Sequence, residues 1–415
     1  MKKLLILIAS SAEWYEFVIY SFCAVYIGQT FFPFETAFSN FLAAFGAFAA
    51  GYLARPFGGL IFGYIGDKKS RSTALGWAAF FMGVPTVGIA LLPSYASIGI
   101  LAPLILVGLR IVQGIAIGGQ YTGSAVILIE AESTVAGKAK ASANVVASAY
   151  VGMLLAILSF QAISYFIPDE FMAAGGWRIL FGIAIILVVM SFIIKNFNKG
   201  EEAPKVPSEN ANNGLKILFS QHKSSMVYML MLCFPGAIVA YFLITILPNI
   251  LTEVLHDGSQ NIPAITVAGI LVFISMFYVS AHLTKYINIK KVIASGMILM
   301  VLTPLPLYHL YKIDSSYLIV FFVGMSAVFG LAYGIILSLF AESFPKEIRY
   351  TGFALTYNIG FGIYGGLLPF LCFYLAENIS DYAAVSMICI SAVVGLIALY
   401  KFEPAKTREF TSRVD

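Results

Sequence analysis

The chain has 415 residues, of which 60% are hydrophobic and 11% are charged, against roughly 25% charged residues in an ordinary soluble domain. A soluble fold of this size could not bury so much apolar surface, so the solvent of this chain is lipid. The formal net charge of +4 comes from basic residues spread through short connecting segments, which argues against a nucleic-acid partner.

Mostly apolar runs recur twelve times along the chain, each with the roughly 20 residues that a bilayer-spanning helix needs. Six of these runs lie near 4–28, 38–64, 73–92, 102–130, 143–167 and 177–196. The other six lie near 223–248, 262–284, 291–311, 316–340, 351–376 and 382–401. The sequence therefore predicts an all-α membrane protein of twelve transmembrane helices.

A polar stretch divides the twelve runs into two equal sets. We predict two pseudo-symmetric six-helix halves, joined by a cytoplasmic linker and followed by a short cytoplasmic tail. The predicted ranges are 1–196 for the N-terminal half, 197–222 for the linker, 223–401 for the C-terminal half and 402–415 for the tail.

Basic residues predict the orientation. With a cytoplasmic N-terminus, Arg55 and Arg110 fall within helices and Arg178 and Lys312 fall outside. All the others of the 25 lysines and arginines are then cytoplasmic. This asymmetry predicts that both termini are cytoplasmic, in the inner membrane of a bacterium.

The two predicted halves repeat a short motif at the same position. The tripeptide Ala-Glu-Ser stands at 131–133, at the inner end of the fourth span, and again at 341–343, at the inner end of the tenth. Basic residues follow each copy within eight positions. The matching position predicts a parallel internal repeat.

Four ionisable residues lie deep in the predicted spans, namely Glu13, Glu16, Arg55 and Arg110. Each costs about 2.5–3.5 kcal/mol on insertion scales, so such residues usually face a cavity or a partner. Glu13 and Glu16 share one helical face and cannot easily both ionise there, so one is expected to bind and release a proton. The alternative is that arginines neutralise both carboxylates only to hold helices together.

The two arginines leave alternatives open. Arg55 precedes Pro56, which frees a backbone carbonyl, and Arg55 either contacts the solute or locks a carboxylate of the first span. Arg110 and Gln113 present a guanidinium and an amide on one face of the fourth span, an arrangement that suits a substrate carboxylate. The alternative for Arg110 is a purely structural ion pair.

Other patterns narrow the class of protein. Glycines at 58, 59 and 63 in the second span, and at 114, 118, 119 and 123 in the fourth, predict seams along which helices approach closely. No P-loop pattern occurs, which disfavours an ATP-driven pump. Cysteines and histidines show no metal-ligand spacing, and no nucleophile–base constellation is visible, so neither a metal site nor an enzyme is predicted.

The segment 63–71, Gly-Tyr-Ile-Gly-Asp-Lys-Lys-Ser-Arg, resembles the signature loop of the major facilitator superfamily. A glycine is followed four positions later by an aspartate and then by a basic cluster, with Ser70 in place of the superfamily's second glycine. The resemblance implies a cytoplasmic charge latch that stabilises the outward-facing state. We assign to this latch Gly63, Asp67, Lys68, Arg71, Glu132, Glu342 and Arg349.

A finer resemblance covers both halves. Its motifs are Glu-Trp-Tyr-Glu-Phe at 13–17, Arg-Pro-Phe-Gly-Gly at 55–59, Gly-Gly-Gln-Tyr at 118–121, Gly-Trp-Arg at 176–178, Arg-Tyr-Thr-Gly at 349–352 and Tyr-Asn at 357–358. Together they resemble the metabolite:proton symporter family, whose members import proline and betaine, dicarboxylates, 2-oxoglutarate, citrate or shikimate. We expect proton coupling at Glu13 and Glu16. The expected substrate-binding residues are Tyr15, Arg55, Arg110, Gln113, Gln120, Tyr121, Tyr357 and Asn358.

The sequence also departs from the family pattern. Gln120 stands where members usually have a glutamate, and Glu16 where they usually have an aspartate, which bears on the proton pathway. The loop at 280–291, the counterpart of the signature loop, has no acidic residue, so the latch is expected to be one-sided. The tail after Lys401 is shorter than the coiled-coil extension of osmosensing members, and we expect no osmotic gating by that device.

The predicted function is secondary active import of a small zwitterion or carboxylate by alternating access. The proton gradient supplies the energy and no cofactor is expected. The four deep charges nearly cancel, which suits a zwitterion or a monocarboxylate. The alternative is a proton-driven exporter or an uncoupled facilitator of the same fold. The expected partners are the solute, protons and the lipid bilayer, and we expect a functional monomer.

Overall fold

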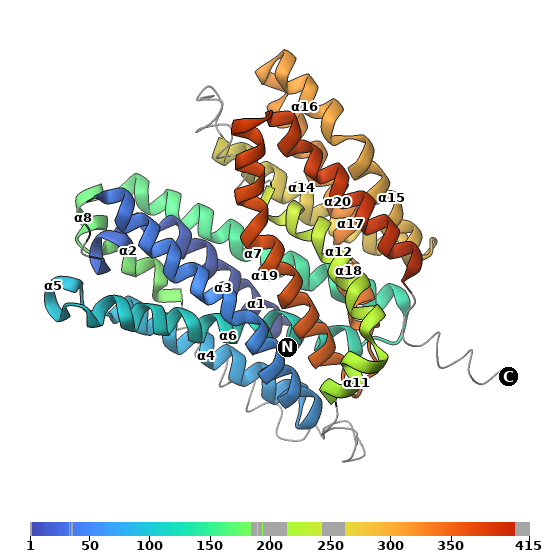
Figure 1. The fold of residues 1–415 in the computed structure, drawn as a ribbon, viewed down its shortest axis with the longest axis horizontal. Coiled ribbons are helices and arrows are strands. Elements are labelled where there is room, and N and C mark those ends of the chain that lie inside the picture. Colours follow the sequence, from blue (N-terminus) through green and yellow to red (C-terminus); the bar gives the residue numbers. More distant parts are fainter. Residues whose placement is uncertain are drawn as a thin grey trace. The chain divides into compact units, whose positions relative to one another are not determined.

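The structure is a computed structural model (Figure 1). It describes residues 2–32, 34, 36–183, 189, 193, 214–242 and 262–402. Within these ranges the chain forms helices and no strands. Nine described helical stretches are long and apolar enough to cross a membrane, and the predicted all-α membrane fold is confirmed. Much of the predicted sixth span, positions 197–213 of the predicted linker, the end of the seventh span and positions 403–415 of the tail lie outside the described residues. The rest of the predicted linker contains the helix α11 (Gly214–Gln221).

The helices before the predicted linker begin and end close to the expected positions. They are α1 (Lys2–Phe22), α2 (Ala24–Phe31), α3 (Ala37–Lys68), α4 (Arg71–Leu91), α5 (Tyr95–Ile98), α6 (Leu101–Glu130), α7 (Val135–Phe166), α8 (Asp169–Ala173) and the 3-10 helix η1 (Gly176–Ile183). The predicted first span is interrupted at Cys23. Its hydrogen-bond ladder nevertheless continues, because the Cys23 amide donates to the Ile19 carbonyl (2.9 Å) and the Ile27 amide to the Cys23 carbonyl (2.8 Å).

The later helices show two further interruptions. They are α11 (Gly214–Gln221), α12 (Lys223–Tyr241), α14 (Ile262–Leu283), α15 (Ile289–Leu302), α16 (Pro304–Ile313), the 3-10 helix η4 (Ser315–Tyr317), α17 (Leu318–Tyr333), α18 (Ile336–Ala341), α19 (Arg349–Asn378) and α20 (Asp381–Lys401). The predicted ninth span divides at Thr303 because Pro304 lacks the amide that would continue α15. The predicted tenth span divides at Gly334 and Ile335.

Short polar side chains fix where several helices begin. The Ser70 side chain accepts a hydrogen bond from the Thr73 amide and so caps α4. Serine at this position therefore supplies an N-cap acceptor that glycine could not provide. Thr36 caps α3 and Ser380 caps α20 in the same way.

The chain divides into two compact units that do not coincide with contiguous halves. Unit 1 consists of Met1–Ile127, Ser148–Asn212 and Lys346–Leu355, and unit 2 of Leu128–Ala147, Asn213–Pro345 and Thr356–Asp415. The first turns of α19 therefore belong with the early helices. The end of α6 and the start of α7 belong with the late helices.

The glycine seams predicted from the sequence bring α3 and α6 of unit 1 into backbone contact. A Cβ atom at Gly58 would overlap the Ile115 carbonyl, one at Gly114 the Gly51 carbonyl, and one at Gly118 the Arg55 carbonyl. Backbones this close leave no room for side chains between them. The two helices that carry Arg55 and Arg110 are thereby fixed side by side.

Gly114→Ala tests this contact. We expect a loss of about 1–3 kcal/mol in the free energy of unfolding, because the added methyl group overpacks the seam. The measurement is the thermal unfolding midpoint in detergent. The matched control is Gly108→Ala in the same helix, where nothing lies within 4 Å of an added Cβ and the change should stay within about 1 kcal/mol. Equal midpoints for the two variants would contradict the close approach.

Candidate functional site

The four deep charges all lie in unit 1, on α1, α3 and α6. Their exposed fractions are 1% for Glu13, Glu16 and Arg55, and 4% for Arg110. At this depth every unmatched charge or hydrogen-bonding atom is costly. The partners of these four side chains therefore decide what each can do.

Arg110 and Glu16 form the centre of a polar network. The Arg110 Nη1 donates to Glu16 Oε1 (2.9 Å) and to Gln113 Oε1 (2.6 Å). The Gln113 Nε2 donates to the same Glu16 oxygen (3.1 Å) and to Thr86 Oγ1 (2.5 Å). Since Thr86 lies on α4, the network joins α1, α4 and α6.

The guanidinium of Arg110 is also covered by aromatic rings. Its central carbon lies 3.4 Å from the ring centroid of Tyr20 and 5.5 Å from that of Phe48. The Tyr20 hydroxyl donates to the Ala44 carbonyl (3.0 Å), which fixes the ring. Stacked guanidinium groups gain cation–π attraction. Even so, Arg110 Nη2 and Glu16 Oε2 have no hydrogen-bond partner among the described residues.

Glu13 differs from Glu16. Neither carboxylate oxygen of Glu13 has a hydrogen-bond partner among the residues that the structure describes. The charges acting on it are those of Arg55 and Glu16. A buried carboxylate without hydrogen bonds is poorly stabilised when ionised. Of the two predicted proton-coupling residues, Glu13 is therefore the one whose carboxylate the described residues leave without a hydrogen bond.

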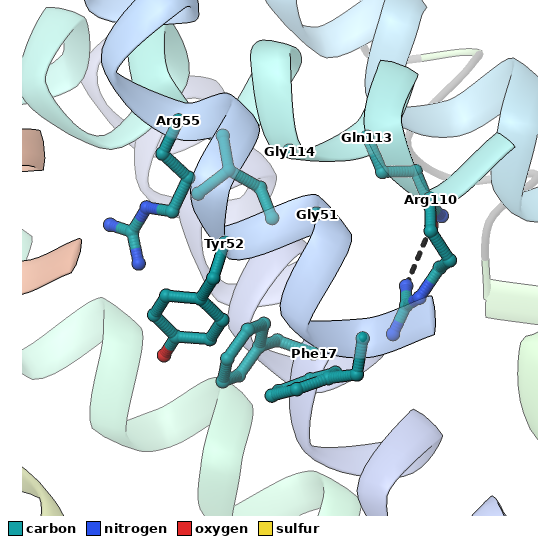
Figure 2. Close-up of a pocket in the computed structure, with 9 residues that line it drawn as sticks. Phe17, Gly51, Tyr52, Arg55, Arg110, Gln113 and Gly114 are labelled. Carbon is teal, nitrogen blue, oxygen red and sulfur yellow. Dashed lines mark hydrogen bonds between the residues drawn. The ribbon is translucent and has the colours of Figure 1, made fainter. Parts of the chain in front are cut away.

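A pocket lies beside the network (Figure 2). It is lined by Phe17, Phe48, Gly51, Tyr52, Arg55, Arg110, Gln113, Gly114 and Ile117. The view shows Arg55 and Arg110 on opposite sides of the pocket. Its cavity volume is about 10 Å³, close to the minimum that holds one water molecule.

Three predicted substrate-binding residues, Arg55, Arg110 and Gln113, line this pocket. Tyr15 lies in the apolar core instead, where its hydroxyl accepts a hydrogen bond from Ser159 Oγ (3.1 Å). Neighbouring residues on a helix point in different directions. The position next to Glu16 therefore did not place the Tyr15 ring at the pocket.

The remaining predicted substrate-binding residues lie elsewhere. The Gln120 amide donates to the Ala9 carbonyl (3.0 Å) and so ties α6 to α1. The Tyr121 ring meets Trp14 edge-on, with 5.7 Å between centroids. Tyr357 and Asn358 belong to unit 2. There Tyr357 stacks on Phe361, with 4.3 Å between centroids, and Asn358 is fully buried.

The aromatic lining of the pocket was not predicted. Phe17, Phe48 and Tyr52 contribute rings to it. The spacing of 48 and 52 by one helical turn, on the same helix as Arg55, was the signal available in the sequence. It carries little weight by itself in a chain with 15% aromatic residues.

Within unit 1 the predicted latch residues Gly63, Asp67 and Arg71 meet the start of α19. The Asp67 carboxylate accepts from the amides of Tyr350 (3.1 Å) and Thr351 (2.8 Å) and from the Thr351 hydroxyl (2.6 Å). It also pairs with Arg71, whose Nη2 donates to the Lys346 carbonyl (2.7 Å). A carboxylate at a helix N-terminus satisfies free amides and gains from the helix dipole.

Close packing accompanies these contacts. A Cβ at Gly63 would lie 2.6 Å from Thr351 Cα, so only glycine lets α19 approach here. The Lys68 ammonium instead lies over the Tyr64 ring of its own helix, 4.6 Å from the centroid. The Arg349 side chain is largely buried.

The two glutamates of the repeated Ala-Glu-Ser motif, Glu132 and Glu342, have different contacts. In unit 2, Glu342 forms an ion pair with Lys138, one of the basic residues that follow the first copy of the motif. Glu132 lies against Gly137, whose added Cβ would be 2.8 Å from the Glu132 carboxylate. The ion pair thus joins the first copy of the repeat region to the second.

The family model described as Major Facilitator Superfamily matches residues 5–369. A proline/betaine transporter of Salmonella typhimurium is 28% identical over 408 residues, which cover 94% of this chain and 80% of the relative. The glycine betaine/proline/ectoine/pipecolic acid transporter OusA of Dickeya dadantii is 28% identical over 406 residues, with the same coverage.

Solved structures share the fold. The proton:xylose symporter XylE matches with a TM-score of 0.78 at 14% identity, over 97% of this chain and 95% of that chain. The E. coli fucose:proton symporter FucP matches with a TM-score of 0.67 at 14% identity, over 97% and 98%. Both have twelve helices in two halves. The signature loop at 63–71 predicted this family correctly, and the chain belongs to the Major Facilitator Superfamily of multi-pass membrane proteins, as a secondary transporter and not an enzyme.

Proposed function

We propose that this protein is a proton-coupled importer of a small zwitterionic or carboxylate metabolite. It works by alternating access in a bacterial inner membrane, with both termini in the cytoplasm. One observation carries the proposal: two buried carboxylates on one face of α1 have unlike surroundings. Arg110 and Gln113 hold Glu16, whereas Glu13 has no hydrogen-bond partner among the described residues.

Because their surroundings differ, Glu13 and Glu16 have different roles in the proposed mechanism. Glu16 is the counterion that Arg110 and Gln113 hold in place by hydrogen bonds. Glu13 carries the transported proton, because its ionised form lacks hydrogen bonds and depends on Arg55 for charge. Interacting acids of this kind release protons as a coupled pair. The sequence left open whether both acids couple to protons or both only pair with arginines. We assign proton coupling to Glu13 and ion pairing to Glu16.

The substrate carboxylate meets the arginines. Arg110 keeps one nitrogen, Nη2, without a hydrogen-bond partner among the described residues, and both Arg110 and Arg55 line the same pocket. A guanidinium matches a carboxylate in shape and charge. The likeness to transporters of proline and betaine supports a substrate in which a carboxylate is joined to a charged nitrogen.

The conformational latch is part of the proposal. We assign to it the contacts of Asp67 and Arg71 with the start of α19, together with the ion pair between Lys138 and Glu342. These contacts hold the cytoplasmic side in its outward-facing state and must break and re-form in each cycle. The energy of several charge-assisted hydrogen bonds is large enough to hold one state over another.

The competing function is an uncoupled facilitator or an exporter, and the residue that supports it is Gln120. Gln120 stands where the family usually has an acid, and its amide bonds the Ala9 carbonyl. An amide cannot carry a proton, so one possible step of a proton pathway is missing. Solute-driven alkalinisation outside proteoliposomes decides between symport and this alternative.

Glu13→Gln should abolish accumulation driven by a pH gradient and leave solute counterflow intact, because the amide mimics the permanently protonated acid. The measurement is radiolabelled proline or betaine uptake into proteoliposomes with and without the gradient. The control is Glu377→Gln, which removes an exposed carboxylate on α19 and should change neither assay. Retained gradient-driven accumulation in Glu13→Gln would rule out this residue as the proton carrier.

Glu16→Gln and Arg110→Met should each lower the free energy of unfolding by about 3 kcal/mol or more, because each leaves a buried charge without its partner. The double variant should lose less than the sum of the two single losses. Chemical unfolding of all four proteins measures this coupling. Uptake should be lost wherever Arg110 is replaced. Additive losses in stability would show that the two charges do not depend on each other.

Asp67→Ala should free the first turn of α19. The Tyr350 and Thr351 amides then lose a charged acceptor, and their hydrogen exchange should accelerate about tenfold or more. Asp314→Ala is the matched control, because Asp314 accepts from the Ser316 amide at a different helix start. Unchanged exchange at Tyr350 and Thr351 in the Asp67 variant would remove this residue from the latch.

A further inference from the structure

Three aromatic rings form a continuous surface in the pocket of unit 1. Phe17 comes from α1, and Phe48 and Tyr52 come from successive turns of α3. The ring centroids are 4.7 Å apart for Phe17 and Phe48, 5.2 Å for Phe17 and Tyr52, and 5.4 Å for Phe48 and Tyr52. Each ring therefore touches the other two.

These rings, and not the charges, form the accessible wall of the pocket. Phe17, Phe48 and Tyr52 are half-buried, whereas Arg55 and Arg110 are almost completely buried behind them. Figure 2 shows Phe17 between Tyr52, which lies next to Arg55, and Arg110 on the other side. A solute that enters meets aromatic surface first.

The ring surface already attracts positive charge on both flanks. The Arg55 guanidinium carbon lies 5.2 Å from the Tyr52 centroid, and the Arg110 carbon lies 5.5 Å from the Phe48 centroid. Ring faces carry a negative quadrupole that binds cations, and quaternary ammonium groups in particular. The same rings can therefore hold an ammonium group in this pocket, whose lining residues in the described part of the chain include no acid.

The flanking charges decide which solute is accepted. A simple cation would be repelled by two guanidinium groups, and a simple anion would leave the ring surface unused. A zwitterion satisfies both, with its carboxylate on a guanidinium and its ammonium on a ring.

Covering Arg110 does not account for all three rings. Tyr20 already stacks on that guanidinium at 3.4 Å, and Phe48 in turn stacks on Tyr20, with 5.8 Å between centroids. Phe17 and Tyr52 pack on Phe48 and line the pocket instead. Since the cavity holds only about 10 Å³, a bound solute requires these two half-buried rings to turn aside and pack around it.

We propose that the surface of Phe17, Phe48 and Tyr52 binds the methylated or cyclic ammonium group of a zwitterionic substrate, and that this contact selects such zwitterions over plain carboxylates. The inference rests on the proposed transport function and names the feature of the substrate that its site recognises.

The test compares two molecules of the same shape. Glycine betaine carries a trimethylammonium group, and 3,3-dimethylbutyrate carries an uncharged tert-butyl group in its place. Binding of each to the purified full-length protein is measured by calorimetry in detergent. Cation–π recognition in a desolvated pocket predicts about tenfold or greater preference for glycine betaine in the wild type.

The variants locate the preference in the rings. Tyr52→Leu and Phe17→Leu should each bring the ratio of the two affinities down by about tenfold, and Tyr52→Phe should restore it because it returns the ring. Phe160→Leu removes a half-buried ring that stacks on Phe22 away from the pocket, and it should keep the wild-type ratio. Circular dichroism of each variant confirms that it is folded.

Three outcomes would overturn the inference: equal affinities in the wild type, an unchanged ratio in both leucine variants, or no binding of glycine betaine. If the protein then carries out gradient-driven uptake of a plain carboxylate such as shikimate or succinate, the transport function stands and only the ammonium site is lost. If no solute is taken up with a proton gradient, the proposed function itself is wrong.

Discussion

A guanidinium in the hydrocarbon layer must have a counterion and hydrogen-bond acceptors, and the contacts of Arg110 meet that requirement. Glu16 supplies the charge, Gln113 supplies a second acceptor, and Tyr20 covers the remaining face. Buried pairs of this kind often add little net stability, yet breaking one is expensive. One pair of charges therefore constrains the positions of α1 and α6, and the hydrogen bond from Gln113 to Thr86 extends this constraint to α4.

This constraint leaves Glu13 in a different chemical situation from Glu16, although both lie on the same face of α1. Arg110 and Gln113 donate hydrogen bonds to one Glu16 oxygen, whereas neither oxygen of Glu13 has a hydrogen-bond partner in the part of the chain that the structure describes. Two identical environments would give two acids that compete for one proton. In the transport cycle that we propose, Glu16 serves as the counterion of Arg110 and Glu13 exchanges the proton.

The sequence predicts the elements of this fold better than the geometry of its site. Hydropathy is enough for the spans, and the seams at Gly58, Gly114 and Gly118 follow from the spacing of small residues. Interruptions at Cys23 and Gly334 escaped prediction because no proline marks either of them. The sequence also did not predict that each unit combines stretches from both ends of the chain. No local pattern indicates that the start of α19 packs with the early helices.

The sequence likewise predicted some of the candidate site residues and missed others. The deep charges could be named because each is costly in lipid. Tyr15 was named by its place in a motif, and its ring lies in the core. The rings of Phe48 and Tyr52 were overlooked, because aromatic residues are common throughout the chain and only their contacts with Phe17 and Arg55 distinguish them.

The backbone contact between α3 and α6 also limits how the site can change shape. Gly51 and Gly114 line the pocket where these two helices touch, and the contact leaves no space between their backbones. Room for a solute must then come from the opposite wall, which α1 provides through Phe17. The same helix carries Glu13, so in the cycle that we propose a movement of this wall around the solute also moves the proton carrier.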